Sequence, residues 1–386
     1  MKKIFIVFLF IFFAGCASTP VKDEPKDTKE EQLRVVESTH ALYVTPKSVE
    51  LMKLEDVDKK ERVFEEDLNN IFEMANKFFD LRRYEEAEKH YRNLLEKNPD
   101  HPSSAYCYYN LGLIYMRVTR WDDAETSFLQ AYNAFEREQD KKDALLNYFE
   151  SLKKAEKWAS LLYESEKFIN NNPFKLNFHE EAKQEISLRY AESLIMTGKV
   201  EEGRKLAEYW IFEITKKLPR YEAIYIPELS LAYYVFGRSF VYEFNMLKLD
   251  TTTDKLEEKC KKIIEAQTQF IKSINVGVIF WTNASAYEVA KLYMDLYAEM
   301  EGHPVPQELN DEEKKCYKCE LWKKISNLLK KSRKTLVASI DAAKKINEEN
   351  EYTQMSFKMI EEIDRIYESK EADCKVFEEV KSVKAQ

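Results

Sequence analysis

Apolar residues recur at helical spacing from Leu68 onward, with apolar side chains at positions i, i+3, i+4 and i+7 of successive segments. The pattern itself repeats. Copies start near residues 68, 105 and 142, a constant period of 37 residues, and a looser fourth copy starts near 184. Each copy contains two apolar stripes joined by a short polar stretch. We therefore predict an all-α fold in which residues 61–218 form about four helix–turn–helix pairs.

Small residues occupy equivalent places in the copies: Ala75, Gly112 and Ala191 in the first stripe, and Ala87, Ala124 and Gly203 in the second. Small side chains at these places let the two helices of a pair approach closely. Pro99 and Pro173 follow the second stripe of the first and third copies. Because proline cannot continue the hydrogen-bond ladder of a helix, the second helix of each of these pairs should end there.

The motif Tyr84-Glu-Glu-Ala87-x3-Tyr91-x2-Leu94-x4-Pro99 returns as Trp121-Asp-Asp-Ala124-x3-Phe128-x2-Ala131. With this motif and period, the copies at 68–101 and 105–138 closely resemble the tetratricopeptide repeat (TPR). The resemblance implies a right-handed superhelix of stacked helix pairs, with its concave wall lined by the first helix of each pair. A generic helical bundle is the alternative, and it leaves the period of 37 residues unexplained.

The 37-residue period fades beyond Pro219, but the helical pattern continues through a region that we place at 219–370. Amphipathic helices are predicted at 226–249, 254–280, 283–301, 310–348 and 352–368, and a tail at 371–386. Asn310-x-x-Glu313 has the spacing of a capping box, which marks a helix start. Pro304 and Pro306 should interrupt the helical structure before it, because two prolines so close together do not fit inside a helix.

The loop Pro304-Val305-Pro306-Gln-Glu-Leu309-Asn-Asp-Glu-Glu313 and the long helices around it resemble the C-terminal part of large TPR proteins of deltaproteobacterial cell envelopes. Some of those proteins belong to gliding-motility machinery. The resemblance covers roughly residues 230–370 and implies a periplasmic scaffold subunit of an envelope complex.

The first sixteen residues have the layout of an export signal: Lys2 and Lys3, an unbroken apolar run at 4–13, and then Ala14-Gly15-Cys16. Ten apolar residues are too few to span a hydrocarbon core of ~30 Å as a helix. Phe13-Ala14-Gly15-Cys16 resembles the bacterial lipobox. The resemblance implies that residues 1–15 are a lipoprotein signal peptide and that Cys16 carries lipid, including palmitate. Plain secretion, with Cys16 incidental, is the alternative.

Residues 16–60 follow as a lipidated cysteine and a tether. The first part of the tether is polar, contains proline and is nearly free of apolar side chains, a composition that favours a flexible chain. Ala17 stands where an aspartate would retain a lipoprotein in the inner membrane. We therefore expect an outer-membrane lipoprotein that faces the periplasm.

The chain has a formal net charge of −9, with both signs interspersed. Nucleic-acid binding relies on a basic face, so the composition argues against a nucleic-acid partner. It also argues against adsorption to anionic lipid head groups, so membrane attachment should depend on the lipid at Cys16.

The candidate chemistry is sparse. Cys316-x-x-Cys319 has the spacing of zinc and redox sites, but no second cysteine or histidine pair completes a tetrahedral zinc site. Structural thiols, or a disulfide with Cys260 or Cys374, are the alternatives. The five histidines are scattered singly, and no carboxylate pair stands in an apolar setting that would raise a pKa for acid–base catalysis. We expect no enzyme, no cofactor and no metal site.

In the TPR family, defined positions of each first helix face the ligand, and Asn110 and Asn147 match a position that donates hydrogen bonds to a bound peptide backbone. Carried onto the first three copies, the resemblance implies a groove lined by Phe72, Asn76, Phe79, Tyr109, Asn110, Leu113, Met116, Arg117, Leu146, Asn147, Glu150, Lys153 and Lys154. Such a mixture suits an extended peptide or a helix. The alternative is that the apolar members cover neighbouring helices, or that the C-terminal helices fill the groove.

The function predicted from these features is a lipid-anchored scaffold or adaptor that binds another envelope protein, with a role in motility or secretion. One alternative is an accessory lipoprotein of outer-membrane β-barrel assembly. Another is the TPR component of a solute transporter, which would enclose a small ligand.

Overall fold

The computed structural model describes residues 68–171, 180–217, 226–249 and 253–384, and all regular structure within them is helical. The helices are α3 Leu68–Asp80, α4 Tyr84–Lys97, α5 Ser104–Arg117, α6 Trp121–Ala134, α7 Glu138–Lys154, α8 Trp158–Asn171, α9 Glu180–Met196, α10 Val200–Lys216, α11 Pro227–Met246, α12 Thr253–Asn275, α13 Ile279–Glu301, α14 Asp311–Lys345 and α15 Glu351–Lys384. None of these described helices is long and apolar enough to cross a membrane. The all-α prediction is confirmed.

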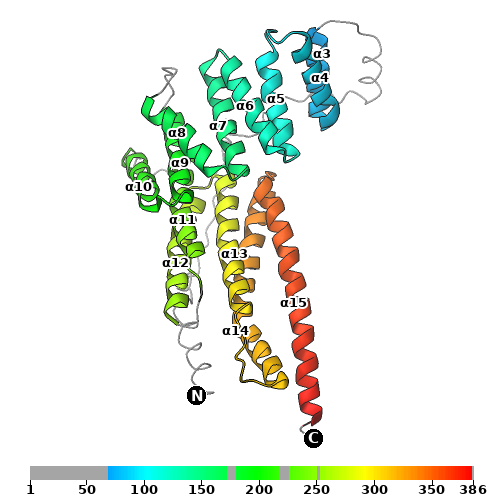
Figure 1. Cartoon of the computed structure of the whole chain (residues 1–386), viewed down its shortest axis with the longest axis vertical. Coiled ribbons are helices and arrows are strands. Elements are labelled where there is room, and N and C mark those ends of the chain that lie inside the picture. The colour runs from blue at the N-terminus through cyan, green and yellow to red at the C-terminus, as the bar shows by residue number, and fades with distance from the viewer. Residues whose placement is uncertain (1–67, 172–179, 218–225, 250–252, 385–386) are drawn as a thin grey trace, which may run out of the picture. The chain divides into compact units, whose positions relative to one another are not determined.

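One compact unit contains α3–α7 and ends at Ala155. Within it α3 packs on α4 and α5 packs on α6, as the first two copies predict, and α5 also contacts α4 while α7 contacts α6 (Figure 1). The interior is made by the residues that repeat between the copies. Ala75, Phe78, Ala87, Tyr91 and Leu94 of the first pair are all fully buried.

The two helices of each pair are joined by the same turn. Arg82 and Thr119 lie 37 residues apart and both have φ of 60°, in the left-handed region. The next residue in each turn donates its backbone N–H to a carbonyl five residues back: Arg83 to Phe78 and Arg120 to Tyr115, both at 2.9 Å. This is the Schellman arrangement that ends a helix. The turn therefore recurs with the same 37-residue period as the sequence pattern.

The predicted close approach between paired helices is confirmed at its glycines. A Cβ atom placed on Gly112 would lie 2.6 Å from the ring of Phe128 on α6. One placed on Gly203 of α10 would lie 2.4 Å from the carbonyl oxygen of Ala191 on α9. Neither position has room for a side chain, because these contacts are far shorter than a normal carbon contact.

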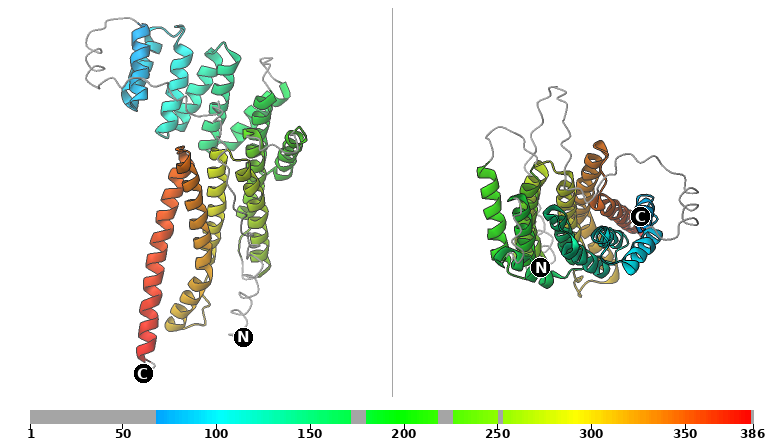
Figure 2. Two further views of the ribbon diagram at one scale, coloured as in Figure 1. Left: turned by 180° about the vertical axis from the view of Figure 1, so that it is seen from behind. Right: turned by 90° about the horizontal axis from the view of Figure 1, so that it is seen from above.

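A second compact unit begins at Glu156 and contains α8–α15. The division falls inside the third predicted copy, whereas the sequence placed the end of the repeat array at 218. Within this unit α8 packs on α9, and α10 packs on both α9 and α11. Figures 1 and 2 show α13, α14 and α15 side by side, in agreement with their contacts.

The paired-helix architecture continues in this second unit with longer helices. A Cβ atom on Gly237 of α11 would lie 2.7 Å from the ring of Phe270 on α12, a contact that matches the one between Gly112 and Phe128. The helices α11 and α12 thus form a lengthened version of the same pair. The helix α13 packs in turn on both α12 and α14.

Several helix ends differ from those predicted, two of them by five residues or more. The helix expected to run to residue 280 ends at Asn275, because Gly277 has φ of 86° and turns the chain. The last helix continues past residue 368, where we predicted its end, to Lys384. The capping box is confirmed: Asn310 Oδ1 accepts from the Glu313 backbone at 2.9 Å, and a Glu313 carboxylate oxygen accepts from the Asn310 backbone at 3.0 Å.

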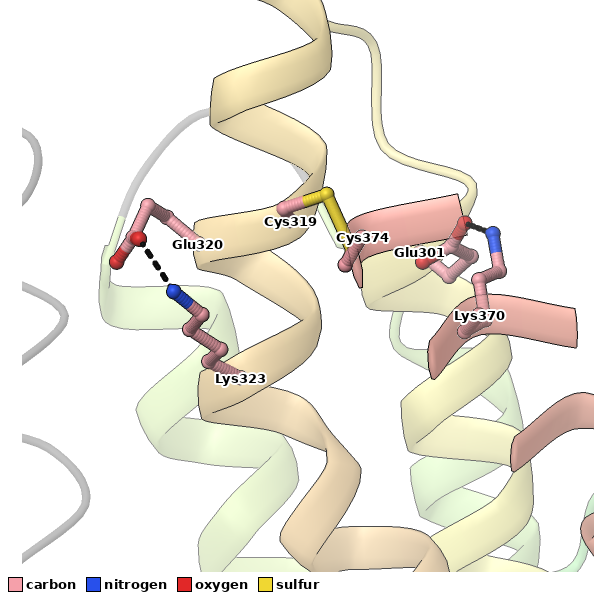
Figure 3. Close-up of a disulfide and its surroundings, with 6 residues drawn as sticks. All are labelled: Glu301, Cys319, Glu320, Lys323, Lys370 and Cys374. Carbon is pink, nitrogen blue, oxygen red and sulfur yellow. Dashed lines mark hydrogen bonds and ion pairs between the residues drawn. A yellow bond between two sulfur atoms is a disulfide. The ribbon is translucent and has the colours of Figure 1, made fainter. Parts of the chain in front are cut away.

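A disulfide between Cys319 and Cys374 joins α14 to α15, with 5.5 Å between the two Cα atoms (Figure 3). Cys374 is one of the two candidate disulfide partners, with Cys260, that the sequence analysis named for the Cys316-x-x-Cys319 pair. Nearby, Lys370 of α15 forms an ion pair with Glu301 of α13, and Figure 3 shows the two side chains pointing toward each other. Cys107, Cys260 and Cys316 remain thiols.

Candidate functional site

The predicted groove residues lie on α3, α5 and α7, which match the first helices of the three predicted copies, and we call the surface that they form the first-helix face. Phe72, Asn76 and Phe79 come from α3. Tyr109, Asn110, Leu113, Met116 and Arg117 come from α5, and Leu146, Asn147, Glu150, Lys153 and Lys154 come from α7. Side-chain hydrogen bonds join the three helices in this order. The face is therefore continuous across the unit.

Between α3 and α5 the link is a triangle of Asn76, Tyr91 and Asn110. The Tyr91 hydroxyl donates to Asn76 Oδ1 at 2.6 Å, and Asn110 Nδ2 donates to the Tyr91 oxygen at 3.0 Å and to Asn76 Oδ1 at 3.3 Å. Burial raises the pKa of Tyr91, so its hydroxyl keeps the proton that it donates. The triangle thus fixes Asn76 and Asn110 in place.

Between α5 and α7 the link is made by two tyrosines. Asn147 Nδ2 donates to the Tyr109 hydroxyl at 3.0 Å and to the backbone oxygen of Asp143 at 2.8 Å. The Tyr106 hydroxyl donates to Asp140 Oδ2 at 3.1 Å. The Tyr109 ring also packs edge-on against Phe128 with centroids 5.6 Å apart. The hydrogen bonds of Tyr106 and Tyr109 position α7 against α5, and the ring contact positions α5 against α6.

The asparagine amides therefore already donate within the protein. A bound peptide backbone would have to replace those bonds to reach the amides of Asn110 and Asn147. Asn147 and Glu150 are buried, and Arg117 is exposed. The remaining predicted groove residues are half-buried: Phe72, Asn76, Phe79, Tyr109, Asn110, Leu113, Met116, Leu146, Lys153 and Lys154. Leu113, Met116 and Arg117 are thus the α5 side chains best placed to contact a partner.

Phe72 and Phe79 also contribute to their own helix pair. The Phe72 ring lies 6.1 Å from the Tyr91 ring, and the Phe79 ring lies 6.0 Å from the Tyr84 ring, centroid to centroid. Each phenylalanine ring thus packs in part against a tyrosine of the neighbouring helix α4, as the alternative interpretation expected. Both side chains are only half-buried, so each also reaches the surface.

The second unit contains a buried ionic cluster that the sequence did not reveal. Arg238 of α11 contacts Glu288 of α13 at 2.5 Å and lies 3.9 Å from Glu192 of α9. Tyr234 also donates to Glu288, at 3.3 Å. Burial lowers the pKa of Arg238, but the two carboxylates outweigh it and raise the pKa above its ordinary value. Neither Glu192 nor Glu288 was singled out from the sequence, and both carboxylates form ion pairs here.

Candidate metal or thiol chemistry gains no support from the geometry. Within the described ranges, no group of three or more His, Cys, Asp or Glu side chains is arranged to hold a metal ion. Burial raises the pKa of Cys107 to about 12, so its thiol stays protonated. Cys16, the proposed lipidation site, lies outside the described residues, as do the signal peptide and the tether.

Three solved TPR structures resemble this chain. YrrB, a TPR protein with an unusual peptide-binding site, is 17% identical, with a TM-score of 0.36 over 57% of this chain and 95% of YrrB. The C-terminal part of a TPR protein from Cytophaga hutchinsonii is 12% identical, with a TM-score of 0.36 over 78% of this chain and 98% of that one. A TPR protein from Parabacteroides merdae is 11% identical, with a TM-score of 0.37 over 77% and 98%.

No curated protein matches the chain. A family model does match part of it, and that part contains α3–α6 with the repeated turn and the close contact between Gly112 and Phe128. Residues 67–137 of this chain match the tetratricopeptide-repeat family.

Proposed function

We propose that the protein is a lipid-anchored adaptor of a bacterial cell envelope, which binds another envelope protein through the first-helix face. The observation that carries the binding half is the continuity of that face. Hydrogen bonds tie α3, α5 and α7 together, and Leu113, Met116 and Arg117 remain at the surface. A rigid face with a few apolar and cationic side chains suits protein recognition.

The proposed envelope location rests on the lipobox resemblance at Cys16 and is supported by the disulfide between Cys319 and Cys374. Disulfides form and persist in oxidising compartments such as the periplasm and are rare in the bacterial cytosol. The location that we propose is the periplasmic face of the outer membrane, and the role is that of a scaffold subunit in a motility or secretion complex.

The anchor is tested by Cys16→Ser. We expect the wild-type protein to fractionate with membranes and to incorporate labelled palmitate, and the variant to do neither, because the thiol that receives the lipid is missing. Cys316→Ser, which removes a thiol that forms no disulfide, serves as the control. If Cys16→Ser stayed in the membrane fraction, the proposed anchor would be wrong.

The binding half is tested by Met116→Asp combined with Arg117→Glu, which reverses the charge of Arg117 and removes the apolar contact of Met116 at the C-terminal end of α5, the middle helix of the first-helix face. We expect the partner that co-purifies with the wild-type protein after crosslinking to be reduced at least tenfold. Lys89→Glu with Asn133→Asp changes the net charge equally at exposed positions of α4 and α6 and should have no effect. Equal loss in both double variants would contradict the proposal.

A further inference from the structure

An open cleft of about 350 Å³ lies between α4 and α6, the second helices of the two TPR pairs. Side chains from three helices line this cleft. Arg92, Leu95 and Glu96 come from α4, Tyr108, Leu111 and Tyr115 from α5, and Asp123, Thr126, Ser127 and Gln130 from α6. Spacings of three, four and seven residues put each set on one side of its helix. The cleft is therefore built by three helix faces.

This cleft is separate from the first-helix face. Successive residues of an α-helix are about 100° apart around the axis. Along α5 the cleft residues Tyr108, Leu111 and Tyr115 cluster in one direction, and Asn110 and Arg117 point roughly opposite to them. A partner in the cleft could thus be bound together with a partner on the first-helix face.

The cleft combines apolar and polar groups. Leu111 is buried, and Leu95 and Tyr108 are half-buried, so the apolar groups lie on α4 and α5. The α6 side is polar, with Thr126 and Gln130 both exposed. A side-chain amide such as that of Gln130 can donate to and accept from a peptide backbone.

One end of the cleft is held rigid by Glu88. Its carboxylate accepts hydrogen bonds from the Tyr115 hydroxyl at 2.7 Å, from Arg92 Nε at 2.9 Å and from Arg120 Nη1 at 3.1 Å. The Arg120 guanidinium also lies over the Tyr115 ring at 4.4 Å. Burial raises the pKa of Glu88, but these hydrogen bonds and charges outweigh it and lower the pKa below its ordinary value. The two arginines at this end are therefore already paired with carboxylates, Glu88 and Asp123.

The other charged groups give the cleft an acidic bias. Asp123 is paired with Arg120 at 2.7 Å, and Glu88 is paired with both arginines. Glu96 is exposed and has no ion-pair partner within the part of the chain that the structure describes. The cleft can therefore still bind a positively charged side chain of a partner.

The polar α6 side favours one shape of occupant. The backbone N–H and C=O groups of a helix are already bonded within the helix, whereas those of an extended segment can pair with the exposed Gln130 amide. The cleft of about 350 Å³ has room for side chains of such a segment.

We propose that the cleft between α4 and α6 is a second protein-binding site, which takes an extended segment of a partner. The segment inserts an apolar side chain against Leu95 and Leu111 and places a lysine or arginine beside Glu96. Gln130 hydrogen-bonds to its backbone. This site does not depend on the first-helix face or on the anchor at Cys16.

A phage-displayed library of random dodecapeptides, selected on the full chain and counter-selected on Thr126→Trp, tests the proposal. Thr126 is exposed, so its replacement by tryptophan should fill the cleft without disturbing the core. We expect the selected peptides to share an apolar residue next to a basic one. A synthetic peptide of that sequence should bind at least tenfold more weakly to Thr126→Trp and to Glu96→Lys.

Two controls separate this site from the rest of the molecule. Ala134→Trp adds the same side chain at an exposed α6 position outside the cleft, and peptide affinity should stay within twofold. Met116→Asp with Arg117→Glu should also leave it unchanged, so failure of the first-helix proposal would not affect this result. A library that yields no enrichment, acidic peptides, or peptides insensitive to Glu96→Lys would overturn the proposal.

Discussion

Replacing Arg238 by methionine should destabilise the unit that contains α8–α15 by about 3–5 kcal/mol, because it leaves the buried carboxylate of Glu288 without its countercharge. Arg238 is the cation that contacts Glu288 at 2.5 Å, and the two side chains are 15% and 8% exposed. It also approaches Glu192, whose side chain is fully buried. The measurement is the free energy of unfolding of the full chain in urea.

The surface provides a matched control. Arg333 binds Asp364 through two hydrogen bonds, at 2.7 Å and 3.1 Å, but both side chains are more than 40% exposed. Arg333→Met should therefore cost no more than about 1 kcal/mol. Combining Arg238→Met with Glu288→Met should recover more than half of the loss, since apolar residues can replace a buried ion pair. Equal losses for Arg238→Met and Arg333→Met would contradict the role of the buried cluster.

Breaking the disulfide by Cys374→Ser should cost about 2–4 kcal/mol, because the bond closes a loop between residues 55 apart in the sequence. The loss should be concentrated in α15. The described residues around Cys374, at 371–375, are otherwise exposed, and Lys370 makes the nearest ion pair to another helix. We expect hydrogen exchange of the α15 backbone beyond residue 367 to accelerate in the variant.

Reduction of the wild-type protein should accelerate exchange in the same segment. Cys316→Ser, one helical turn before Cys319, should leave it unchanged, because Cys316 is not part of the disulfide. Unchanged α15 exchange in reduced protein would show that the disulfide does not hold this helix.

The first two helix pairs could be predicted from the sequence because their determinants are local and repeat every 37 residues. The lengthened pair α11/α12 could not be predicted by that period. Gly112 and Phe128 are 16 residues apart, whereas Gly237 and Phe270 make the same contact at a separation of 33 residues. A search for the glycine–aromatic contact at variable spacing could have found it.

The ionic cluster and the cleft depend on contacts between distant parts of the sequence. Glu192, Arg238 and Glu288 are about 50 residues apart, and each has the sequence setting of an ordinary charged helix residue. The helical C-terminus was missed for the opposite reason. Residues 371–386 were expected to be a tail, although they contain glutamate, lysine and alanine, which are strong helix formers. The disulfide partner of Cys319 likewise required the packing of α15 on α14.

The central claim, that the first-helix face holds a protein partner, is tested most directly by site-specific photocrosslinking in living cells. A photoreactive phenylalanine analogue at Leu113 should give one dominant crosslinked protein, which disappears when Met116→Asp and Arg117→Glu are added. The same analogue at Ala134, on the exposed end of α6, should not give that product. Crosslinks at Leu113 that are absent, or that equal those from Ala134, would contradict the account.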